Sequence, residues 1–225
     1  MHEPILALEG ALDSFSVALL RDGKIFAESL TKQAALEDGL RLVRAQLETA
    51  QLGLCDLGGI AVGTGPGGFT GLRITIAFAK SLAFGAKVPL VGVSSFDILD
   101  AGAGAEARVP RVTIVQGRPG IACMRRTARD GTQVACGPVA PTLARVTSEG
   151  EEIAMIGTTK DVQSAALERG LSVHLIPAGT ELPAATLARI ARMRPAASSV
   201  HEVAPDYGEL PAVRANVVKS PLGEC

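Results

Sequence analysis

The sequence predicts an α/β fold with mixed sheets flanked by helices, and three observations lead to this prediction. The chain opens with three apolar runs joined by short turns, which indicates an antiparallel meander. Segments with helical periodicity then alternate with short apolar runs, as they do in βαβ units. A glycine-rich loop separates one of these strands from the helix that follows it. The antiparallel opening argues against a plain dinucleotide-binding domain, which begins with a βαβ unit.

The opening meander contains three predicted strands. They are Ile5–Leu8, Ser14–Leu20 and Ile25–Leu30. The turn before the third strand contains Asp22-Gly23, a pair that accepts positive φ angles and therefore favours a tight hairpin. The first strand is short and wholly apolar, which is typical of a buried strand.

Two long helices and two further strands follow the meander. The first helix is predicted over Thr31–Gln51, because four apolar residues repeat at i, i+4, i+7 and i+11. These residues are Leu36, Leu40, Val43 and Leu47. Strands are predicted at Gly58–Gly63 and Pro89–Val93, and the second helix, ending near Gly85, crosses between them. Since a helix connects them, these two strands should be parallel.

A run of small residues, Ala101–Ala105, indicates a boundary between two lobes. It divides the chain into an N-terminal lobe, residues 1–104, and a smaller C-terminal lobe with an extended tail, residues 105–225. Ser94 or Ser95 caps the short helix that precedes the boundary. The second lobe has predicted strands at Val109–Val115, Ile121–Thr127, Glu152–Ile156 and Leu171–Ile176, and helices at Asp161–Glu168 and Pro183–Met193.

Composition excludes several classes of protein. The 225 residues correspond to about 1.5 domains of typical size. Hydrophobic residues make up 47% and charged residues 20%, so the chain is globular and not disordered. A net charge of −1 and few aromatic residues disfavour a protein that binds nucleic acid without a partner protein. No apolar run reaches membrane-spanning length and no signal peptide is evident, so we expect a soluble cytoplasmic protein.

The four cysteines are scattered along the chain. They are Cys55, Cys123, Cys136 and Cys225, and no CxxC pair exists among them. Without such pairs a zinc knuckle is not expected. We interpret them as small thiols in a reduced compartment. The alternative is that Cys123 and Cys136 face each other across a hairpin.

The glycine-rich loop is the most specific segment of the sequence. Its residues are Gly63, Thr64, Gly65, Pro66, Gly67, Gly68, Phe69, Thr70, Gly71, Leu72 and Arg73. Its spacing fits G-x-G-x-x-G, but no acidic residue ends the next strand and no lysine stands where a P-loop needs one. An anion at the helix N-terminus stays open. The best interpretation is a tight strand-to-helix turn, with the Thr70 hydroxyl capping the helix through the Arg73 N–H.

The helix after the loop is apolar on more than one side. One face carries Leu72, Ile76, Ala79 and Ala83, and another carries Ile74, Phe78 and Leu82. A helix of this kind is buried on two sides. One side covers the sheet, and the other meets a second helix or another chain. With the first helix it forms a patch that could dimerise. The alternative is that both helices complete this chain's own core.

The sequence contains no recognisable catalytic constellation or metal site. The histidines His2, His174 and His201 have no partner at i+3 or i+4, and no nucleophile elbow is present. We therefore expect no catalytic residue, no metal ligand and no cofactor. Two arginine clusters could contact phosphates, although solvated surfaces are the better interpretation. They are Arg125, Arg126 and Arg129, and Arg189, Arg192 and Arg194.

Several segments resemble the TsaB (YeaZ) family. The family loop reads G-x-G-P-G-S-F-T-G-L-R, and residues 63–73 repeat it with Gly68 in place of the serine. The other matching segments are Ile5–Leu19, Ala79-Lys80, Pro89–Ser95, and Pro205 and Tyr207 in a P-x-Y pattern. The resemblance implies the actin-like, sugar-kinase-like two-lobed fold in a shortened form.

The resemblance also implies a function and partners. It implies a non-catalytic scaffold or activator in the complex that adds threonylcarbamoyl to the adenosine next to the anticodon, in tRNAs reading ANN codons. The implied partners are a TsaD-like catalytic subunit, a TsaE-like ATPase and a second copy in a homodimer, with tRNA contacted only through the complex. The implied partner interface lies on the two long helices and comprises Leu36, Leu40, Val43, Leu47, Leu72, Ile76, Ala79, Lys80 and Ala83.

The chain departs from the family pattern at the first turn, which reads Glu9-Gly10-Ala11 where the family usually has Asp-Thr-Ser. The departure weakens the case for nucleotide binding. Two other functions stay open. One is an ATPase or phosphotransferase of the same fold acting on a small molecule, with magnesium near Glu9 or Asp13. The other is a glycoprotease-like peptidase, which the missing metal-binding histidines disfavour.

Overall fold

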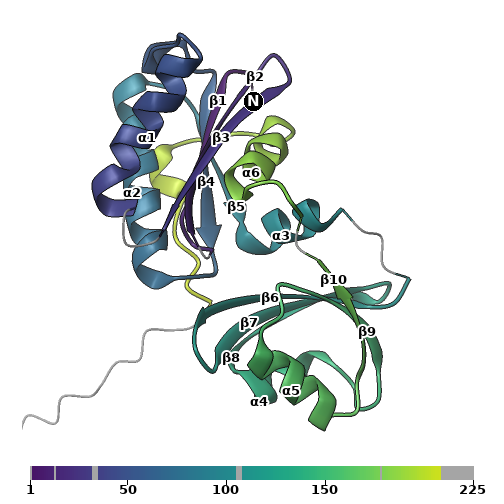
Figure 1. Ribbon diagram of the computed structural model, residues 1–225. Coiled ribbons are helices and arrows are strands. Elements are labelled where there is room, and N and C mark those ends of the chain that lie inside the picture. Colours follow the sequence, from purple (N-terminus) through teal and green to yellow (C-terminus); the bar gives the residue numbers. More distant parts are fainter. Residues whose placement is uncertain (1, 13, 32–34, 105–107, 178, 209–225) are drawn as a thin grey trace, which may run out of the picture.

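The computed structural model describes residues 2–12, 14–31, 35–104, 108–177 and 179–208, with the side chains of 27–31 and 35–37 outside the description. It has the predicted α/β character, with two five-stranded mixed sheets, each in its own lobe. Figure 1 shows the lobes one above the other, joined through a short helix and the segment before the C-terminus.

The first lobe is built on the sheet β3-β2-β1-β4-β5. Its strands are β1 (Ile5–Glu9), β2 (Ser14–Arg21), β3 (Lys24–Thr31), β4 (Gly59–Gly65) and β5 (Leu90–Ser94). The meander is antiparallel, and β1, β4 and β5 are parallel, as the order of elements predicts. Asp22 and Gly23 both take positive φ angles in the predicted hairpin.

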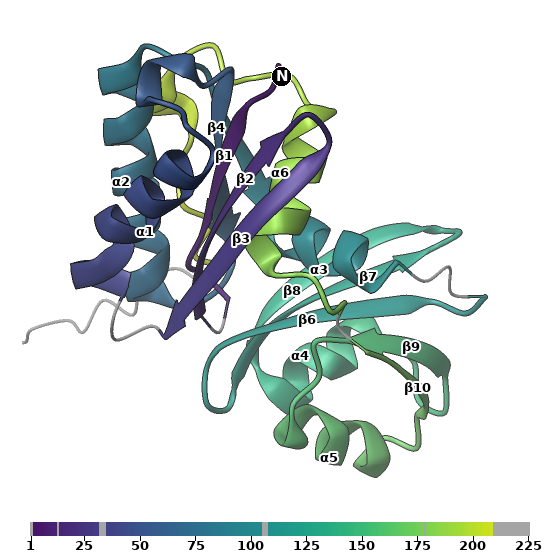
Figure 2. The ribbon, with the colours of Figure 1, turned by 45° about the horizontal axis from the view of Figure 1, so that its top comes forward.

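Helices cover both faces of this sheet (Figure 2). They are α1 (Ala35–Thr49), α2 (Phe69–Ala86), α3 (Ser95–Ala103) and α6 (Pro183–Arg192), with 3-10 turns at Leu54–Asp56 and Val200–Glu202. α1 and α2 pack on one face, and α6 packs on the other against β1 and β2. Ser94, one of the two predicted candidates, caps α3, because its hydroxyl accepts the Phe96 N–H at 3.1 Å.

The second lobe is built on the sheet β10-β9-β6-β7-β8. Its elements are β6 (Arg111–Arg118), β7 (Ile121–Ala128), β8 (Gly131–Pro138), α4 (Val139–Val146), β9 (Glu152–Ile156), α5 (Lys160–Glu168) and β10 (Ser172–Ile176). The sequence analysis did not anticipate β8 or α4. The exposed start of β8 lacks an apolar alternation, and Pro141 lies inside the first turn of α4.

The chain leaves the second lobe after β10, so the lobes are not divided as the sequence boundary implied. α6 buries four alanines and Leu187 against the first sheet, in a cluster with β1, β2 and β5. Val203 then joins the core between the same sheet and α1 and α2. Residues from 183 onward that the structure describes therefore complete the N-terminal lobe. Their apolar spacing showed a buried helix face but not which sheet it covers.

The predicted partner face of α1 and α2 turns inward and requires correction. Six of its residues are at most 7% exposed and lie in the first lobe's own core: Val43, Leu47, Leu72, Ile76, Ala79 and Ala83. They fill the space over β1 and β4, as the alternative interpretation held. Leu40 is 63% exposed and faces away from that core, and Lys80 is partly exposed. The side chain of Leu36 lies outside the described part of the chain.

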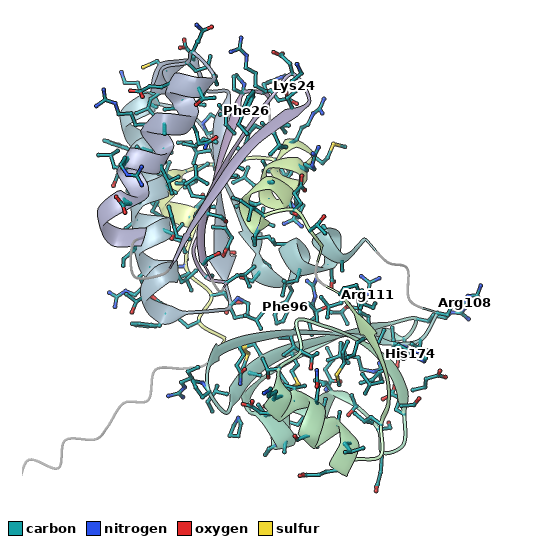
Figure 3. All side chains as sticks on the ribbon, viewed as in Figure 1. Lys24, Phe26, Phe96, Arg108, Arg111 and His174 are labelled. Carbon is teal, nitrogen blue, oxygen red and sulfur yellow. A yellow bond between two sulfur atoms is a disulfide. The ribbon has the colours of Figure 1, made fainter. Side chains whose placement is uncertain are left out.

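An ion cluster joins the lobes, and we call it the interlobe ion cluster. Arg125 on β7 donates to Asp97 at 2.5 Å and to Asp100 at 2.7 Å, both on α3. Arg194, just after α6, donates to the other oxygen of Asp97 at 2.7 Å. Arg111 lies 3.8 Å from Asp100, and Figure 3 shows Arg111 and Phe96 at the junction of the lobes. Two arginines that might have contacted phosphates thus bind this chain's own carboxylates.

The interlobe ion cluster predicts a pH-dependent contribution to stability. Burial by itself raises the pKa of Asp97, but hydrogen bonds from Arg194 and Arg125 outweigh it, so the pKa lies below its ordinary value. The pairing therefore stabilises the fold above the pKa of the unfolded carboxyl, about 4, and the stabilisation is lost as pH falls through the folded-state pKa.

We expect Arg125→Met to lower the free energy of unfolding by about 2 kcal/mol at pH 7, because two partly buried carboxylates lose their shared partner. The difference from the unsubstituted protein should shrink below about pH 4. Urea unfolding followed by circular dichroism across pH measures both effects. Arg129→Met, at an exposed position after the same strand, is the control and should change little. A pH-independent loss at Arg125 would contradict the charge-pairing explanation.

Candidate functional site

The glycine-rich loop lies where the two lobes meet and packs directly on the first turn of the chain. The Gly68 N–H donates to the Ala11 carbonyl oxygen at 2.7 Å. A methyl group added at Gly67 would lie 2.2 Å from the same oxygen, and one added at Gly71 would lie 2.1 Å from the Gly10 oxygen. Only residues without a side chain allow two backbones to approach this closely. The loop is therefore held by backbone contact.

The helix after the loop begins without a side-chain cap, which corrects the prediction for Thr70. α2 starts at Phe69, its N-cap is Gly68, and no side chain caps it. Thr70 is exposed inside the first turn. The prediction placed the cap two residues late, because a glycine at the N-cap gives no side-chain signal in the sequence.

The side chain of Glu9 fills the turn at the end of β1. The side chain is fully buried, and its Oε1 accepts the Ala11 N–H at 2.7 Å and the Leu12 N–H at 3.2 Å. A methyl group added at Gly63 of the loop would lie 3.0 Å from the same oxygen. The backbone N–H groups that could hold an external anion are thus used by a carboxylate of this chain. Asp13, the other predicted acid, lies outside the described residues.

The segment before the C-terminus crosses the glycine loop, and we call residues 203–208 the strap. The Asp206 N–H donates to the Thr64 carbonyl oxygen at 2.7 Å, and a methyl group added at Gly65 would lie 2.4 Å from the Asp206 oxygen. The Tyr207 and Phe69 rings lie 5.1 Å apart, centroid to centroid. The strap therefore packs against the loop at Thr64, Gly65 and Phe69.

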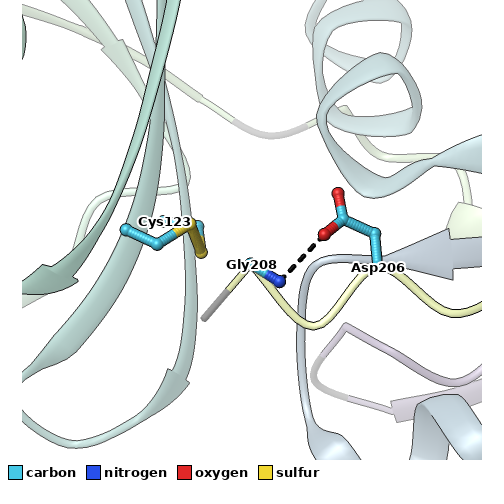
Figure 4. Close-up of a disulfide and its surroundings, with 4 residues drawn as sticks. Cys123, Asp206 and Gly208 are labelled. Atoms are coloured by element: carbon cyan, nitrogen blue, oxygen red, sulfur yellow. Dashed lines mark hydrogen bonds between the residues drawn. A yellow bond between two sulfur atoms is a disulfide. The ribbon is translucent and has the colours of Figure 1, made fainter. Parts of the chain in front are cut away.

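The strap ends against a disulfide in the second lobe (Figure 4). Cys123 on β7 and Cys136 on β8 are cross-strand partners and are joined, S–S 2.07 Å. This corrects the interpretation of both as free thiols and supports the alternative that they face each other. A methyl group added at Gly208 would lie 2.2 Å from the Cys123 sulfur. Cys55 is free and exposed, and Cys225 lies outside the described residues.

The structure brings together two sequence motifs that lie far apart in the chain. The loop of residues 63–73 contacts Tyr207 of the P-x-Y pattern through Phe69, and Arg73 lies 5.2 Å over the Phe69 ring. Sequence reasoning singled out both motifs without predicting their contact. It treated Glu9 only as a candidate magnesium ligand and gave no role to Asp206 or Gly208. A carboxylate at the end of a buried strand was the available signal for Glu9.

This arrangement is suited to holding backbones together. The Gly68, Ala11 and Leu12 N–H groups have acceptors within the chain, while the start of α2 has no side-chain cap. Among the described residues, no cluster of three or more histidine, cysteine or acidic side chains is arranged to hold a metal ion. In the same part of the chain, every helix is too short or too polar to cross a membrane.

Comparison with known proteins gives consistent matches to one family. A family model described as "TsaD: tRNA N6-adenosine threonylcarbamoyltransferase" matches residues 29–213. The "tRNA threonylcarbamoyladenosine biosynthesis protein TsaB" of Escherichia coli is 38% identical over 109 residues, which is 48% of this chain and 47% of that protein. The TsaB protein of Bacillus subtilis is 34% identical over 43% of each chain. The alignments thus span about half the length of these curated relatives.

Solved structures share the fold over most of the chain. "YeaZ from Pseudomonas aeruginosa" has a TM-score of 0.66 and 24% identity, covering 90% of this chain and 98% of that one. A second Pseudomonas aeruginosa structure, titled as similar to peptidase YEAZ, reaches 0.70 with 23% identity and covers 92% and 100%. A Bacteroides thetaiotaomicron protein with an actin-like ATPase fold matches at 0.52 and 10% identity, over 82% and 95%. The fold is the actin-like fold that the resemblance implied.

The backbone contact under the loop predicts a large effect for a single methyl group. We expect Gly71→Ala to lower the free energy of unfolding by about 3 kcal/mol, because the new carbon would press on the Gly10 carbonyl. Gly85→Ala, in the same helix with no atom within 4 Å, should instead raise it by up to about 1 kcal/mol. Thermal and urea unfolding compare the two variants. If the two variants change the free energy of unfolding equally, the close approach of Gly71 to the Gly10 carbonyl does not contribute to stability.

The strap predicts that Gly208 is required to hold Tyr207 in place. Gly208→Ala combines a positive φ with a contact to the Cys123 sulfur, whereas Gly150→Ala has a similar φ and no atom within 4 Å. Tyr207 is the single tyrosine and tryptophan is absent, so tyrosine fluorescence reports on the strap alone. We expect acrylamide quenching to increase in Gly208→Ala and to stay unchanged in Gly150→Ala. If quenching is unchanged in both variants, the strap does not pack against the disulfide in solution.

Proposed function

The chain belongs to the TsaD family, with TsaB (YeaZ) proteins among its relatives, and on this premise we propose that it is a non-catalytic scaffold or activator subunit for tRNA threonylcarbamoylation. The complex would add threonylcarbamoyl to the adenosine next to the anticodon in tRNAs reading ANN codons. A TsaD-like subunit would supply the transfer chemistry, and a TsaE-like ATPase would join them. tRNA would reach this chain only through the complex.

The packing of the glycine loop within this chain is the single observation that most favours a non-catalytic role. A glycine loop at a helix start is suited to phosphate, yet here the Gly68 N–H binds Ala11 and the strap lies against Thr64 and Gly65. Glu9 occupies the neighbouring turn. The same contacts disfavour the alternative function, an ATPase or phosphotransferase acting on a small molecule. No ATP binding in millimolar magnesium would remove that alternative.

The outer side of α1 and α2 is the surface we assign to the protein partner. Leu40 on α1 is 63% exposed and Phe84 on α2 is 72% exposed, whereas five other large apolar residues of these helices are buried. These are Leu42, Val43, Leu47, Leu72 and Ile76. Charged pairs flank Leu40, with Arg41 bonded to Asp38 at 3.1 Å and Arg44 to Glu48 at 2.6 Å. Exposed apolar side chains within a polar surround are typical of protein interfaces. A TsaD-like subunit or a second copy of this chain would bind here.

Genetic complementation with paired variants tests the proposed function. Deleting the gene should remove threonylcarbamoyladenosine from tRNA, and the unsubstituted gene should restore it. We expect Leu40→Asp to fold normally but to lose both the complex with the TsaD-like protein and the modification, because it places a charge in the exposed interface. Ile76→Asp, at a 4% exposed core position, should unfold and serves as the control for burial.

Light scattering measures the molar mass of the complex directly. The purified protein is measured alone and mixed with the TsaD-like protein of the same genome. Normal modification in the deletion strain would overturn the proposed function. Full complementation by a folded Leu40→Asp variant would overturn the interface alone.

A further inference from the structure

The disulfide lies on the side of the second sheet that faces the first lobe. Cys123 is 6% exposed and belongs to a small apolar cluster with Phe96 of α3 and Val115 of β6. Cys136 is partly exposed and packs against the same cluster. The two cysteines are direct partners on neighbouring antiparallel strands, so the hairpin keeps them close whether or not their sulfurs are joined. The disulfide is therefore part of the contact between the lobes.

The strap lies directly on both sulfur atoms, as Figure 4 shows for its last residue. A methyl group added at Gly208 would lie 2.2 Å from Cys123 Sγ and 2.7 Å from Cys136 Sγ. The same methyl group would lie 3.3 Å from Pro66 of the glycine loop. The disulfide, the strap and the loop thus meet at one point, with no space between them for an added carbon atom.

The strap is anchored firmly at its start and weakly at its end. Val203 is buried in the core of the first lobe. Beyond it, the Asp206 N–H donates to the glycine loop at 2.7 Å, and the Tyr207 ring lies against the Phe69 ring. The Gly208 N–H is bonded within the strap itself, to Asp206 Oδ1 at 2.8 Å. A segment held by few contacts opens at a lower free-energy cost than a strand or a helix does.

Reduction would place two thiols where the disulfide lies. Two sulfurs that are no longer bonded, each carrying a hydrogen atom or a charge, move apart to van der Waals distance. On one side they meet Phe96 and Val115, whose positions are fixed by α3 and β6. On the other side they meet Gly208. The end of the strap is therefore the neighbour that gives way.

We propose that the disulfide between Cys123 and Cys136 is a redox-modification site, reduced by a dithiol, and that its reduction releases the end of the strap from the glycine loop. In the oxidised state the strap packs as described above. In the reduced state residues 205–208 leave the loop and uncover the Phe69 ring, while Val203 stays in the core. This inference is independent of the function proposed above, because it rests on the disulfide and the strap alone.

The reaction is an ordinary thiol–disulfide exchange. A thiolate of the dithiol attacks Cys136 Sγ, the more exposed sulfur, and the electron pair of the S–S bond leaves on Cys123 Sγ, which takes a proton. The second thiolate of the dithiol then attacks the mixed disulfide, and Cys136 leaves and takes a proton in turn. Two electrons and two protons pass to the protein, and the dithiol becomes a cyclic disulfide. An oxidised dithiol reverses the reaction.

Hydrogen exchange of single amides, followed by NMR on the full chain, tests the proposal. Cys55→Ser and Cys225→Ser leave Cys123 and Cys136 as the two remaining cysteines. Dithiothreitol reduces the protein and its cyclic disulfide reoxidises it, with the number of free thiols measured by alkylation and mass spectrometry. We expect the Asp206 amide to exchange about tenfold faster in the reduced protein, and to return to the slower rate on reoxidation.

Two amides away from the strap separate this local release from a general loss of stability. The Gly68 N–H, bonded to Ala11 under the loop, and the Ala154 N–H, bonded to Pro110 in the second lobe, should exchange at the same rate in both states. Equal acceleration of all three amides would contradict the proposal. An unchanged Asp206 rate would overturn it, as would two free thiols that persist in the oxidised dithiol.

A matched pair of glycine variants tests whether the sulfurs act through Gly208. In Gly208→Ala the added methyl group displaces the strap, so the Asp206 amide should exchange rapidly in both redox states. Gly150→Ala has a similar φ and no atom within 4 Å, and should keep the difference between the states. A full redox response in Gly208→Ala would overturn the role of this contact. If Gly208→Ala fails to fold, the comparison of the two redox states decides.

Discussion

The close contact between the glycine loop and the first turn of the chain is the constraint on which the rest of the structure depends. Two backbones meet here, with the Gly68 N–H bonded to Ala11 and no space for a methyl group at Gly67 or Gly71. Because the loop lies this deep, the strap can cross it and reach the disulfide of the second lobe. The start of α2 and the junction of the lobes both follow from that contact.

Carboxylates of this chain bind backbone N–H groups at the first turn and arginines at the junction of the lobes. Glu9 binds the N–H groups of the first turn, Asp161 lies at the start of α5, and Asp97 and Asp100 hold Arg125 and Arg194 across the lobes. Since each of these charges is satisfied internally, the lobes are fixed by ion pairs and backbone bonds and need no bridging ligand. These contacts support the non-catalytic role proposed above.

The two long helices serve two surfaces at once. Their inner faces fill the core over β1 and β4, and their outer faces leave Leu40 and Phe84 exposed. Sequence periodicity identified both helices but assigned the inner residues to a partner. Spacing along a helix gives the angle between side chains and does not give the direction of the sheet. That direction was decided by the strand order β2-β1-β4, which places both helices on one face.

The sequence by itself determined the α/β class, the meander, most strands and helices, and the family resemblance, because local spacing, turn chemistry and an ordered motif carry this information. Tertiary structure alone decided the return of α6 to the first lobe, the joining of Cys123 to Cys136, the contact of the strap with the loop, and the burial of Glu9. Each of these depends on groups distant in sequence meeting in space, or on which side of an element faces the core. Neither property is written in the local pattern of a single chain.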